Sequence, residues 1–145
     1  MAGKKKVLFV CIHNSARSQM AEAFLNQMAP ERFEAQSAGI EPGKLNPIVV
    51  AAMKEISIDI SSKKTTAVTD LINERRTYDY IITVCDEASA ERCPVFPGSG
   101  KRLHMGFPDP SAFKGSNEEK LKKTIEVRDQ IKEKIRQWIE HENSD

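Results

Sequence analysis

The chain alternates between short runs with the pattern of strands, the first of them almost wholly apolar, and stretches in which apolar residues recur every three or four positions. The first run, Lys6–Cys11, has the pattern of a strand that is buried on both faces. The segment Gln19–Met28 carries apolar side chains at helical spacing and ends before Pro30. Phe33–Ala38, which ends at Gly39, predicts a second strand. Strand, helix and strand in this order indicate a βαβ unit.

The rest of the chain repeats this alternation. Asn46 followed by Pro47 is a typical helix start and predicts a helix over Pro47–Ile56. Four further elements are expected: a strand over Tyr78–Val84, a short helix within Asp86–Arg92, a weaker strand over Lys101–Phe107 and a long helix from Ser116 to about Glu140. The residues of this last helix expected to face inward are Leu121, Ile125, Ile131, Ile135 and Trp138. We therefore expect one α/β domain over residues 1–145, with a mainly parallel sheet covered by helices.

Composition and charge exclude several classes of function. The 145 residues include 22 basic and 21 acidic side chains, so the net charge is +1. No strong field would draw the protein to nucleic acid or anionic lipid, and any anion site must be local. The apolar run Val7–Ile12 behind Lys4–Lys6 is too short for a signal peptide, and no stretch approaches the roughly 18 apolar residues of a membrane span. We expect a cytoplasmic protein.

Three cysteines, Cys11, Cys85 and Cys93, are too few, and odd in number, for the disulfide framework of a secreted protein. In a reducing compartment such residues are core residues, metal ligands or reactive thiols. Cys11 and Cys85 each lie at the carboxyl end of a predicted strand, where parallel sheets bind their ligands. This position favours reactive thiols.

The segment from Cys11 to Ser18 has the layout of an anion-binding loop between a strand and a helix. The backbone N–H groups of such a loop can face an oxyanion, and the start of the helix adds the positive end of its dipole. Arg17 can grip two oxygens, the same field favours the thiolate of Cys11 as a nucleophile, and Ser18 can hydrogen-bond that thiolate. The alternative is a buried cysteine that ends a strand and a solvated arginine that opens a helix; the strand–loop–helix context favours the anion loop.

The stretch Val7–Ala23, VLFVCIHNSARSQMAEA, resembles the phosphate-binding loop of the low-molecular-weight protein tyrosine phosphatases, and more closely that of the arsenate reductases that share their fold. The resemblance runs from Lys6 to about Trp138. It implies a four-stranded parallel sheet flanked by helices on both faces. It also implies an oxyanion-binding loop formed by Cys11, Ile12, His13, Asn14, Ser15, Ala16 and Arg17.

Some members of this family bind potassium beside the loop. The resemblance implies such a site at Asn14, Glu22 and Ser37. The aspartate that completes it falls near Ala67 and Val68 here, without a match.

A phosphatase needs one nucleophilic cysteine, whereas this chain has Cys85 and Cys93 in addition, eight positions apart. Such a pair can supply two electrons. Two other interpretations stay open: buried structural thiols, or a zinc site of three cysteines and a histidine, whose ligands are usually paired two to four residues apart. The resemblance implies a relay in which Cys11 attacks arsenate, Cys85 attacks Cys11 and releases arsenite, and Cys93 attacks Cys85. Thioredoxin then reduces the disulfide. The spacing of the pair is about one residue longer than the family's common form.

Asp109 lies between Pro108 and Pro110, after the last predicted strand. Taken alone it reads as a turn residue. The Asp-Pro loop of the family implies that Asp109 is the general acid that protonates the leaving hydroxyl. Phosphatase loops continue with aromatic residues, and Ser111 and Ala112 in their place favour a small inorganic anion.

The sequence and the resemblance together thus predict a monomeric arsenate reductase that requires no cofactor, with potassium as an additional ion that the resemblance implies. Two alternatives remain. One is a tyrosine phosphatase that forms a phosphocysteine at Cys11, an activity that a reductase would show weakly as a by-product. The other is a non-catalytic thiol protein, either a redox sensor or a metal binder.

Overall fold

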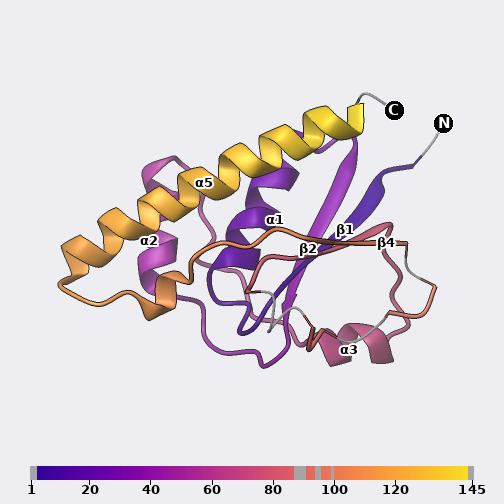
Figure 1. The fold of residues 1–145 in the computed structure, drawn as a ribbon, viewed down its shortest axis with the longest axis horizontal. Helices are drawn as coiled ribbons and strands as arrows, with labels where there is room; N and C mark the ends of the chain where they lie inside the picture. The colour runs from indigo at the N-terminus through magenta and orange to yellow at the C-terminus, as the bar shows by residue number, and fades with distance from the viewer. Residues whose placement is uncertain (1–2, 87–90, 94–95, 99, 144–145) are drawn as a thin grey trace.

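Four parallel strands form the centre of the structure, a computed structural model that describes residues 3–86, 91–93, 96–98 and 100–143. The elements in chain order are β1 (Lys5–Cys11), α1 (Arg17–Met28), β2 (Phe33–Gly39), α2 (Pro47–Glu55), α3 (Val68–Asn73), β3 (Tyr80–Thr83), β4 (Lys101–His104), the 3-10 helix η1 (Pro110–Ala112) and α5 (Asn117–Asn143). The strands lie in the order β2-β1-β3-β4 (Figure 1). The expected single α/β domain with four parallel strands is confirmed.

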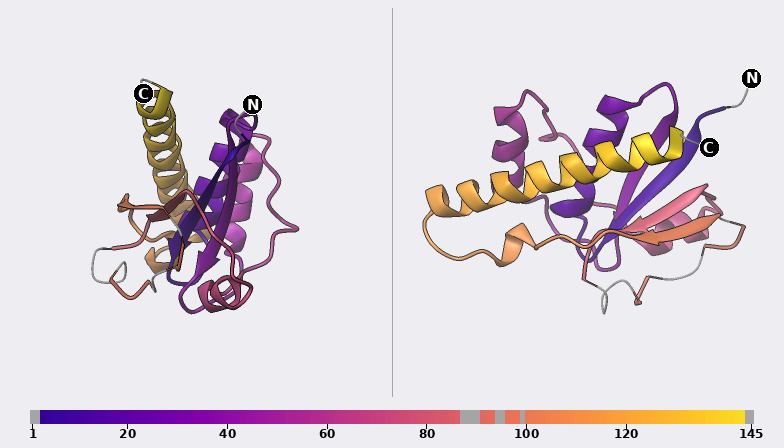
Figure 2. Two further views of the ribbon diagram at one scale, coloured as in Figure 1. Left: turned by 90° about the vertical axis from the view of Figure 1, so that its right-hand side faces the viewer. Right: turned by 45° about the horizontal axis from the view of Figure 1, so that its top comes forward.

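Side chains of β1 alternate between the two faces of the sheet. Val7, Phe9 and Cys11 pack in one cluster with residues of α1, α2 and α5, whereas Leu8 and Val10 pack in a second cluster with residues of α3. Helices therefore cover both faces, as expected. The long helix α5 packs against α1 and α2 and crosses them (Figure 2).

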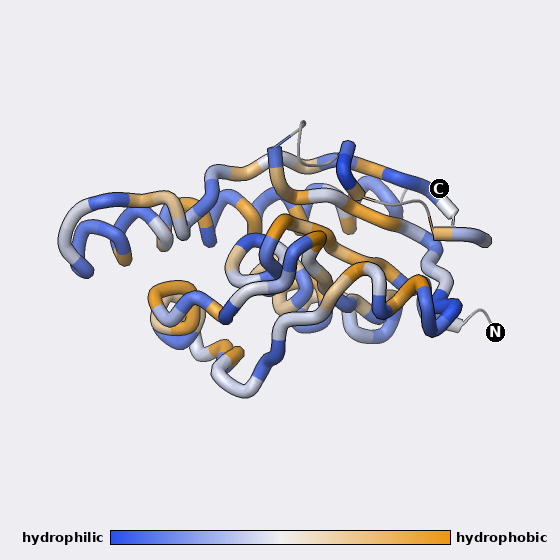
Figure 3. The backbone as a smooth tube through the Cα atoms, turned by 90° about the horizontal axis from the view of Figure 1, so that it is seen from below, coloured by the Kyte–Doolittle hydropathy of each residue, from blue (hydrophilic) through white to orange (hydrophobic). Residues whose placement is uncertain are grey.

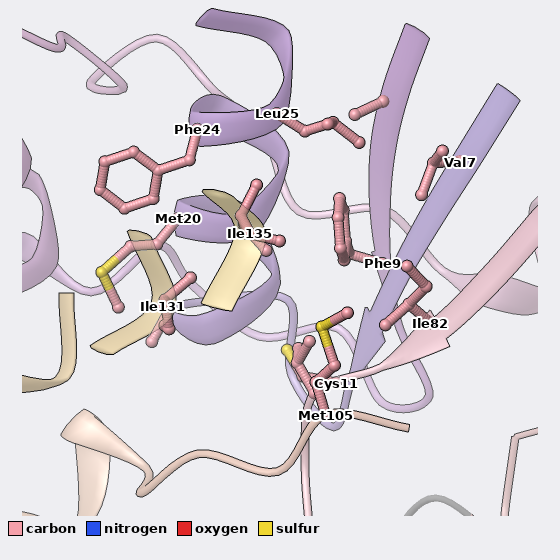
Figure 4. Packing of buried hydrophobic residues seen from close by; sticks show 14 of the residues in the cluster. Val7, Phe9, Cys11, Met20, Phe24, Leu25, Ile82, Met105, Ile131 and Ile135 are labelled. Carbon is pink, nitrogen blue, oxygen red and sulfur yellow. The ribbon is translucent and has the colours of Figure 1, made fainter. Parts of the chain in front are cut away.

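The larger cluster forms the main core between the sheet and the helices. Figure 4 shows Met20, Ile131 and Ile135 among its members, with Cys11 and Met105 at one end. The expectation for α5 is confirmed for Ile131, Ile135 and Trp138, whereas Leu121 and Ile125 are only half-buried. Hydrophobic residues gather in the middle of the molecule, and the outer turns are largely hydrophilic (Figure 3).

Most predicted elements differ from the structure by one or two residues at their ends. Two ends differ by three residues: β4 ends at His104 rather than Phe107, and α5 ends at Asn143 rather than near Glu140. The Met105 N–H still donates to the Thr83 carbonyl, after which the chain departs toward Pro108. Of the short helix expected within Asp86–Arg92, residues 87–90 lie outside the described residues.

Sequence reasoning missed α3. This helix is only six residues long, too short for a helical period to stand out, and it buries just Val68 and Leu71. Among the described residues, no helix combines the length and the apolar character needed to cross a membrane.

Candidate active site

The loop between β1 and α1 is held from outside by backbone hydrogen bonds. The carbonyls of Cys11, Ile12, His13 and Ser15 accept from the N–H groups of Ile40, Glu41, Gly43 and Asn46, all in the segment that follows β2. Because the carbonyl and the next N–H point in opposite directions across a trans peptide, the N–H groups that follow these carbonyls face the concave side of the loop. The loop therefore has the backbone arrangement that suits an oxyanion.

Two backbone features make this loop fit against β2. Asn14 has φ of 55°, in the left-handed region that asparagine tolerates better than most residues. A Cβ on Gly39 would lie 2.8 Å from Asn14 N, His13 C and Ile12 O, all backbone atoms. Glycine is therefore required at position 39 by the close approach of the loop.

The thiol of Cys11 is set in a chain of hydrogen bonds. Its Sγ lies 2.8 Å from Ser18 Oγ and accepts from the Asn14 N–H at 3.2 Å. The Asn14 side-chain amide donates to Ser18 Oγ at 2.8 Å, which leaves the serine proton to point at the sulfur. The thiol is 2% exposed. Ser18, which the sequence predicts as a hydrogen-bond partner of the Cys11 thiolate, thus lies next to the sulfur.

Two residues that orient Asn14 were not foreseen from the sequence. The Thr66 N–H donates to Asn14 Oδ1 at 2.9 Å. Gln19, whose side chain is buried, donates to both the backbone and the side-chain oxygen of Asn14 at 3.1 and 3.2 Å. No short sequence motif could have indicated the role of Thr66, because it lies 52 positions from Asn14 in the chain.

Arg17 begins α1 and points into the loop region with 5% exposure. Its Nη1 donates to the Phe107 carbonyl at 3.1 Å, and its Nη2 lies 3.7 Å from Asp109 Oδ2. Within the described part of the chain, its Nε has no hydrogen-bond partner. A buried guanidinium with unused donors is suited to binding an anion in two-point fashion.

Asp109 lies opposite, at the start of η1, and its side chain is 34% exposed. Its Oδ1 accepts from the Ser111 N–H at 3.0 Å. Asp109 therefore forms the turn expected from the sequence and also places its carboxylate close to Arg17.

Cys85 and Cys93 are both buried, but in different places. Cys85 belongs to the cluster that contains Cys11, whereas Cys93 packs in the cluster on the α3 face of the sheet. Burial raises the pKa of the Cys85 thiol; the Arg17 guanidinium opposes this rise and the Cys11 thiol adds to it. Burial also raises the pKa of the Cys93 thiol, against the effect of Arg102. None of the three cysteines forms a disulfide.

The residues implied for potassium are only partly brought together. Ser37 Oγ donates to Glu22 Oε1 at 2.7 Å, and the Lys63 ammonium pairs with the other carboxylate oxygen. The side-chain oxygen of Asn14 is turned toward Thr66 and Gln19. These residues do not fit a resident potassium ion, because a lysine of the chain already neutralises the one acidic ligand. Among the described residues, no group of three His, Cys, Asp or Glu side chains is placed to hold a metal.

Comparison with known proteins decides the family. The model of the family "Low molecular weight phosphotyrosine protein phosphatase" matches residues 6–145. The chain belongs to this family. An arsenate reductase from Shouchella clausii is 41% identical over 138 residues, which cover 94% of this chain and 96% of that protein.

Solved structures of arsenate reductases are also similar to this member of the family. One, in a phosphate-binding state, has a TM-score of 0.75 at 28% identity, covering 94% of this chain and 98% of that chain. A thioredoxin-dependent arsenate reductase from Corynebacterium glutamicum has a TM-score of 0.68 at 28% identity, covering 99% of this chain and 64% of that one.

Proposed function

We propose that this protein reduces arsenate to arsenite by a thiol relay whose reductant is thioredoxin. The observation that carries the proposal is the burial of Cys85 in the same cluster as Cys11, close enough to Arg17 and Cys11 for both to affect its titration. Hydrolysis of a phosphate ester needs one nucleophilic thiol in this loop. A two-electron reduction needs a second thiol, and Cys85 lies in the same buried cluster as the first.

In the first step the Cys11 thiolate attacks arsenic, and Asp109 donates a proton to the departing hydroxyl. Arg17 and the inward N–H groups of the loop hold the remaining oxygens, while the Ser18 hydroxyl stabilises the thiolate before attack. The product is a thiol adduct in which arsenic is still As(V) and is bound to Cys11 Sγ.

In the second step the Cys85 thiolate attacks Cys11 Sγ. The sulfur–arsenic bond breaks, its electron pair stays on arsenic, and arsenite leaves as As(III) while a Cys11–Cys85 disulfide forms. Cys93 then attacks Cys85, which restores the Cys11 thiolate and moves the disulfide to Cys85–Cys93. Reduction by thioredoxin completes the cycle, so the electrons require no bound cofactor.

The third thiol must move to take part. Cys93 packs among residues such as Tyr78 and Phe96 on the α3 face, whereas Cys85 faces the opposite cluster. The reduced arrangement therefore keeps Cys93 away from Cys85, and formation of their disulfide requires the residue to leave its position. We propose a monomeric enzyme, since all of these groups come from one chain, and a cytoplasmic location, where three thiols stay reduced.

The rival is a phosphatase that uses Cys11, Arg17 and Asp109 alone. The residues after Asp109 argue against an aromatic ester as the main substrate, since Ser111 and Ala112 are exposed and offer no ring to stack on it. Slow hydrolysis of phosphate esters remains an expected by-product of the shared loop.

The deciding experiment is arsenate-dependent oxidation of NADPH with thioredoxin and thioredoxin reductase, for the wild type, Cys85→Ser and Cys11→Ser. Hydrolysis of a phosphate ester by the same three proteins is the control for an intact loop. We expect turnover of arsenate in the wild type only, with ester hydrolysis kept in Cys85→Ser and lost in Cys11→Ser. Ester hydrolysis in the wild type without arsenate turnover would make the protein a phosphatase.

A further inference from the structure

A buried acidic residue lies behind the anion loop, outside the reaction described above. Glu22, on α1, is 6% exposed. One of its carboxylate oxygens accepts from Ser37 Oγ, and the other pairs with Lys63, whose side chain is 44% exposed. A carboxylate buried with only a neutral partner would be costly, so Lys63 supplies the compensating charge.

The segment that carries Lys63 also reaches the catalytic thiol. The Lys64 carbonyl accepts from Gln19 at 3.2 Å, and the Thr66 N–H donates to Asn14 Oδ1 at 2.9 Å. The Thr66 carbonyl in turn accepts from the Gly39 N–H at 2.7 Å. Residues 63–66 therefore run from Glu22 to Asn14 and are attached at both ends.

Asn14 connects residues 63–66 to the nucleophile Cys11. With its side-chain oxygen held by Thr66, its amide N–H₂ is directed at Ser18 Oγ, and Ser18 is directed at Cys11 Sγ. Displacing residues 63–66 would remove the Thr66 bond to Asn14 Oδ1 and the Lys64 carbonyl that holds Gln19, the second donor to the same oxygen. The chain of contacts thus connects the Glu22–Lys63 pair to the thiol through Thr66, Asn14 and Ser18.

We propose that the Lys63 ammonium acts as a built-in monovalent cation: it neutralises Glu22 and anchors residues 63–66, so that the arrangement around Cys11 needs no potassium. Lys63 is a positioning residue and touches neither substrate nor sulfur. The inference rests on the proposed function only in taking Cys11 as the nucleophile. Removal of the ammonium leaves a buried carboxylate and an open space beside it, which is the condition for a potassium ion to enter.

The test compares the wild type with Lys63→Met, which removes the ammonium but keeps an unbranched side chain only one atom shorter, and Lys63→Arg, which keeps the charge. Lys54→Met, at an exposed lysine near the end of α2, is the matched control for loss of a surface charge. Each protein is studied in choline chloride and in potassium chloride at the same ionic strength, about 100 mM, so that screening is equal. Two measurements are made without arsenate: the melting temperature, and the rate of alkylation of Cys11 at neutral pH, followed by peptide mapping.

In choline, Lys63→Met should alkylate Cys11 about tenfold more slowly than the wild type, and potassium should restore the rate to within about twofold. Potassium should also raise the melting temperature of Lys63→Met. The wild type, Lys63→Arg and Lys54→Met should respond equally to the two salts.

Two results would overturn the proposal. One is a wild type whose Cys11 reactivity rises with potassium. The other is a Lys63→Met variant that is as reactive as the wild type in choline, or whose loss potassium leaves uncorrected. Neither measurement uses arsenate or thioredoxin, so failure of the proposed reaction leaves both interpretable. Arsenate turnover in the two salts is then measured separately.

Discussion

Arg17 and Asp109 face each other across the anion loop, with Arg17 Nη2 3.7 Å from Asp109 Oδ2. An oxyanion bound to the guanidinium would therefore lie next to the carboxyl group. In the proposed reaction, the negative charge of Asp109 would compete with the anion for Arg17, whereas the general acid would assist the leaving hydroxyl.

Substitution of Asp109 should therefore affect catalysis and anion binding in different ways. We expect Asp109→Asn to lower the rate of adduct formation about 100-fold or more, because the general acid is lost. Phosphate, measured by calorimetry as a stand-in for arsenate, should bind as tightly as to the wild type or more tightly. Asp70→Asn, at an exposed position on α3, is the control. Weaker phosphate binding by Asp109→Asn would contradict the assignment.

Ser18→Ala tests the hydrogen bond to the nucleophile. Loss of a bond to a charged sulfur costs about 1.5–3 kcal/mol, so alkylation of Cys11 and arsenate turnover should each fall about 10- to 100-fold at neutral pH. Phosphate affinity should change little, since Ser18 Oγ is bonded to Cys11 and Asn14 rather than turned to the anion. Equal loss of reactivity and affinity would indicate a collapsed loop instead.

Gly39→Ala tests the packing of the loop on β2. The new methyl group would lie 2.8 Å from three backbone atoms of residues 12–14, which cannot move aside as a flexible side chain could. We expect phosphate binding at least about tenfold weaker in a protein whose far-ultraviolet circular dichroism is unchanged.

Gly43→Ala is the matched control for this substitution. Its Cβ would meet His13 Cβ at 3.5 Å, an ordinary contact. Binding by Gly43→Ala should stay within about twofold of the wild type. Equal effects of the two alanines would contradict the steric argument.

The raised pKa of Cys85 gives the second chemical step a pH dependence. Because burial favours the neutral thiol, the thiolate is a small fraction at neutral pH and grows about tenfold per pH unit until the raised pKa is reached. Single-turnover release of arsenite, limited by attack on the Cys11 adduct, should therefore quicken from about pH 6.5 to about pH 8.5. A rate that is constant or falls over this range would show that another step is limiting.

The ion pair between Glu41 and Arg92 connects the catalytic loop to the segment that carries Cys93. Glu41 is bonded to Ile12 and His13 through its backbone, and Arg92 precedes Cys93 directly. Since Cys93 must leave its position, we expect Arg92→Gln to speed formation of the Cys85–Cys93 disulfide about two- to fivefold, an effect that high salt reproduces in the wild type.

Arg76→Gln breaks a surface pair of similar exposure, with Glu74, and serves as the control. Its rate of disulfide formation, read by mass after quenching of free thiols, should match that of the wild type. Slower formation in Arg92→Gln would mean that the ion pair assists the movement of Cys93 rather than opposing it.

The sequence by itself determined β1, the anion loop and α1. Cys11, Arg17 and Ser18 lie within eight positions, and a strand, a loop and a helix of this length bring such neighbours together by local geometry alone. The parallel sheet followed from the alternation of elements, because a right-handed crossover leaves few other arrangements.

Only the tertiary structure decided which distant residues meet. If β3 continued, strict alternation would place Cys85 on the α3 face with Ile81; the strand ends at Thr83, and Cys85 packs instead with Cys11. Because Cys85 packs on that side, it lies on the opposite face of the sheet from Cys93. Lys63 reaches Glu22 across 41 positions of chain, a pairing that depends on the path of an irregular segment and that no local pattern records.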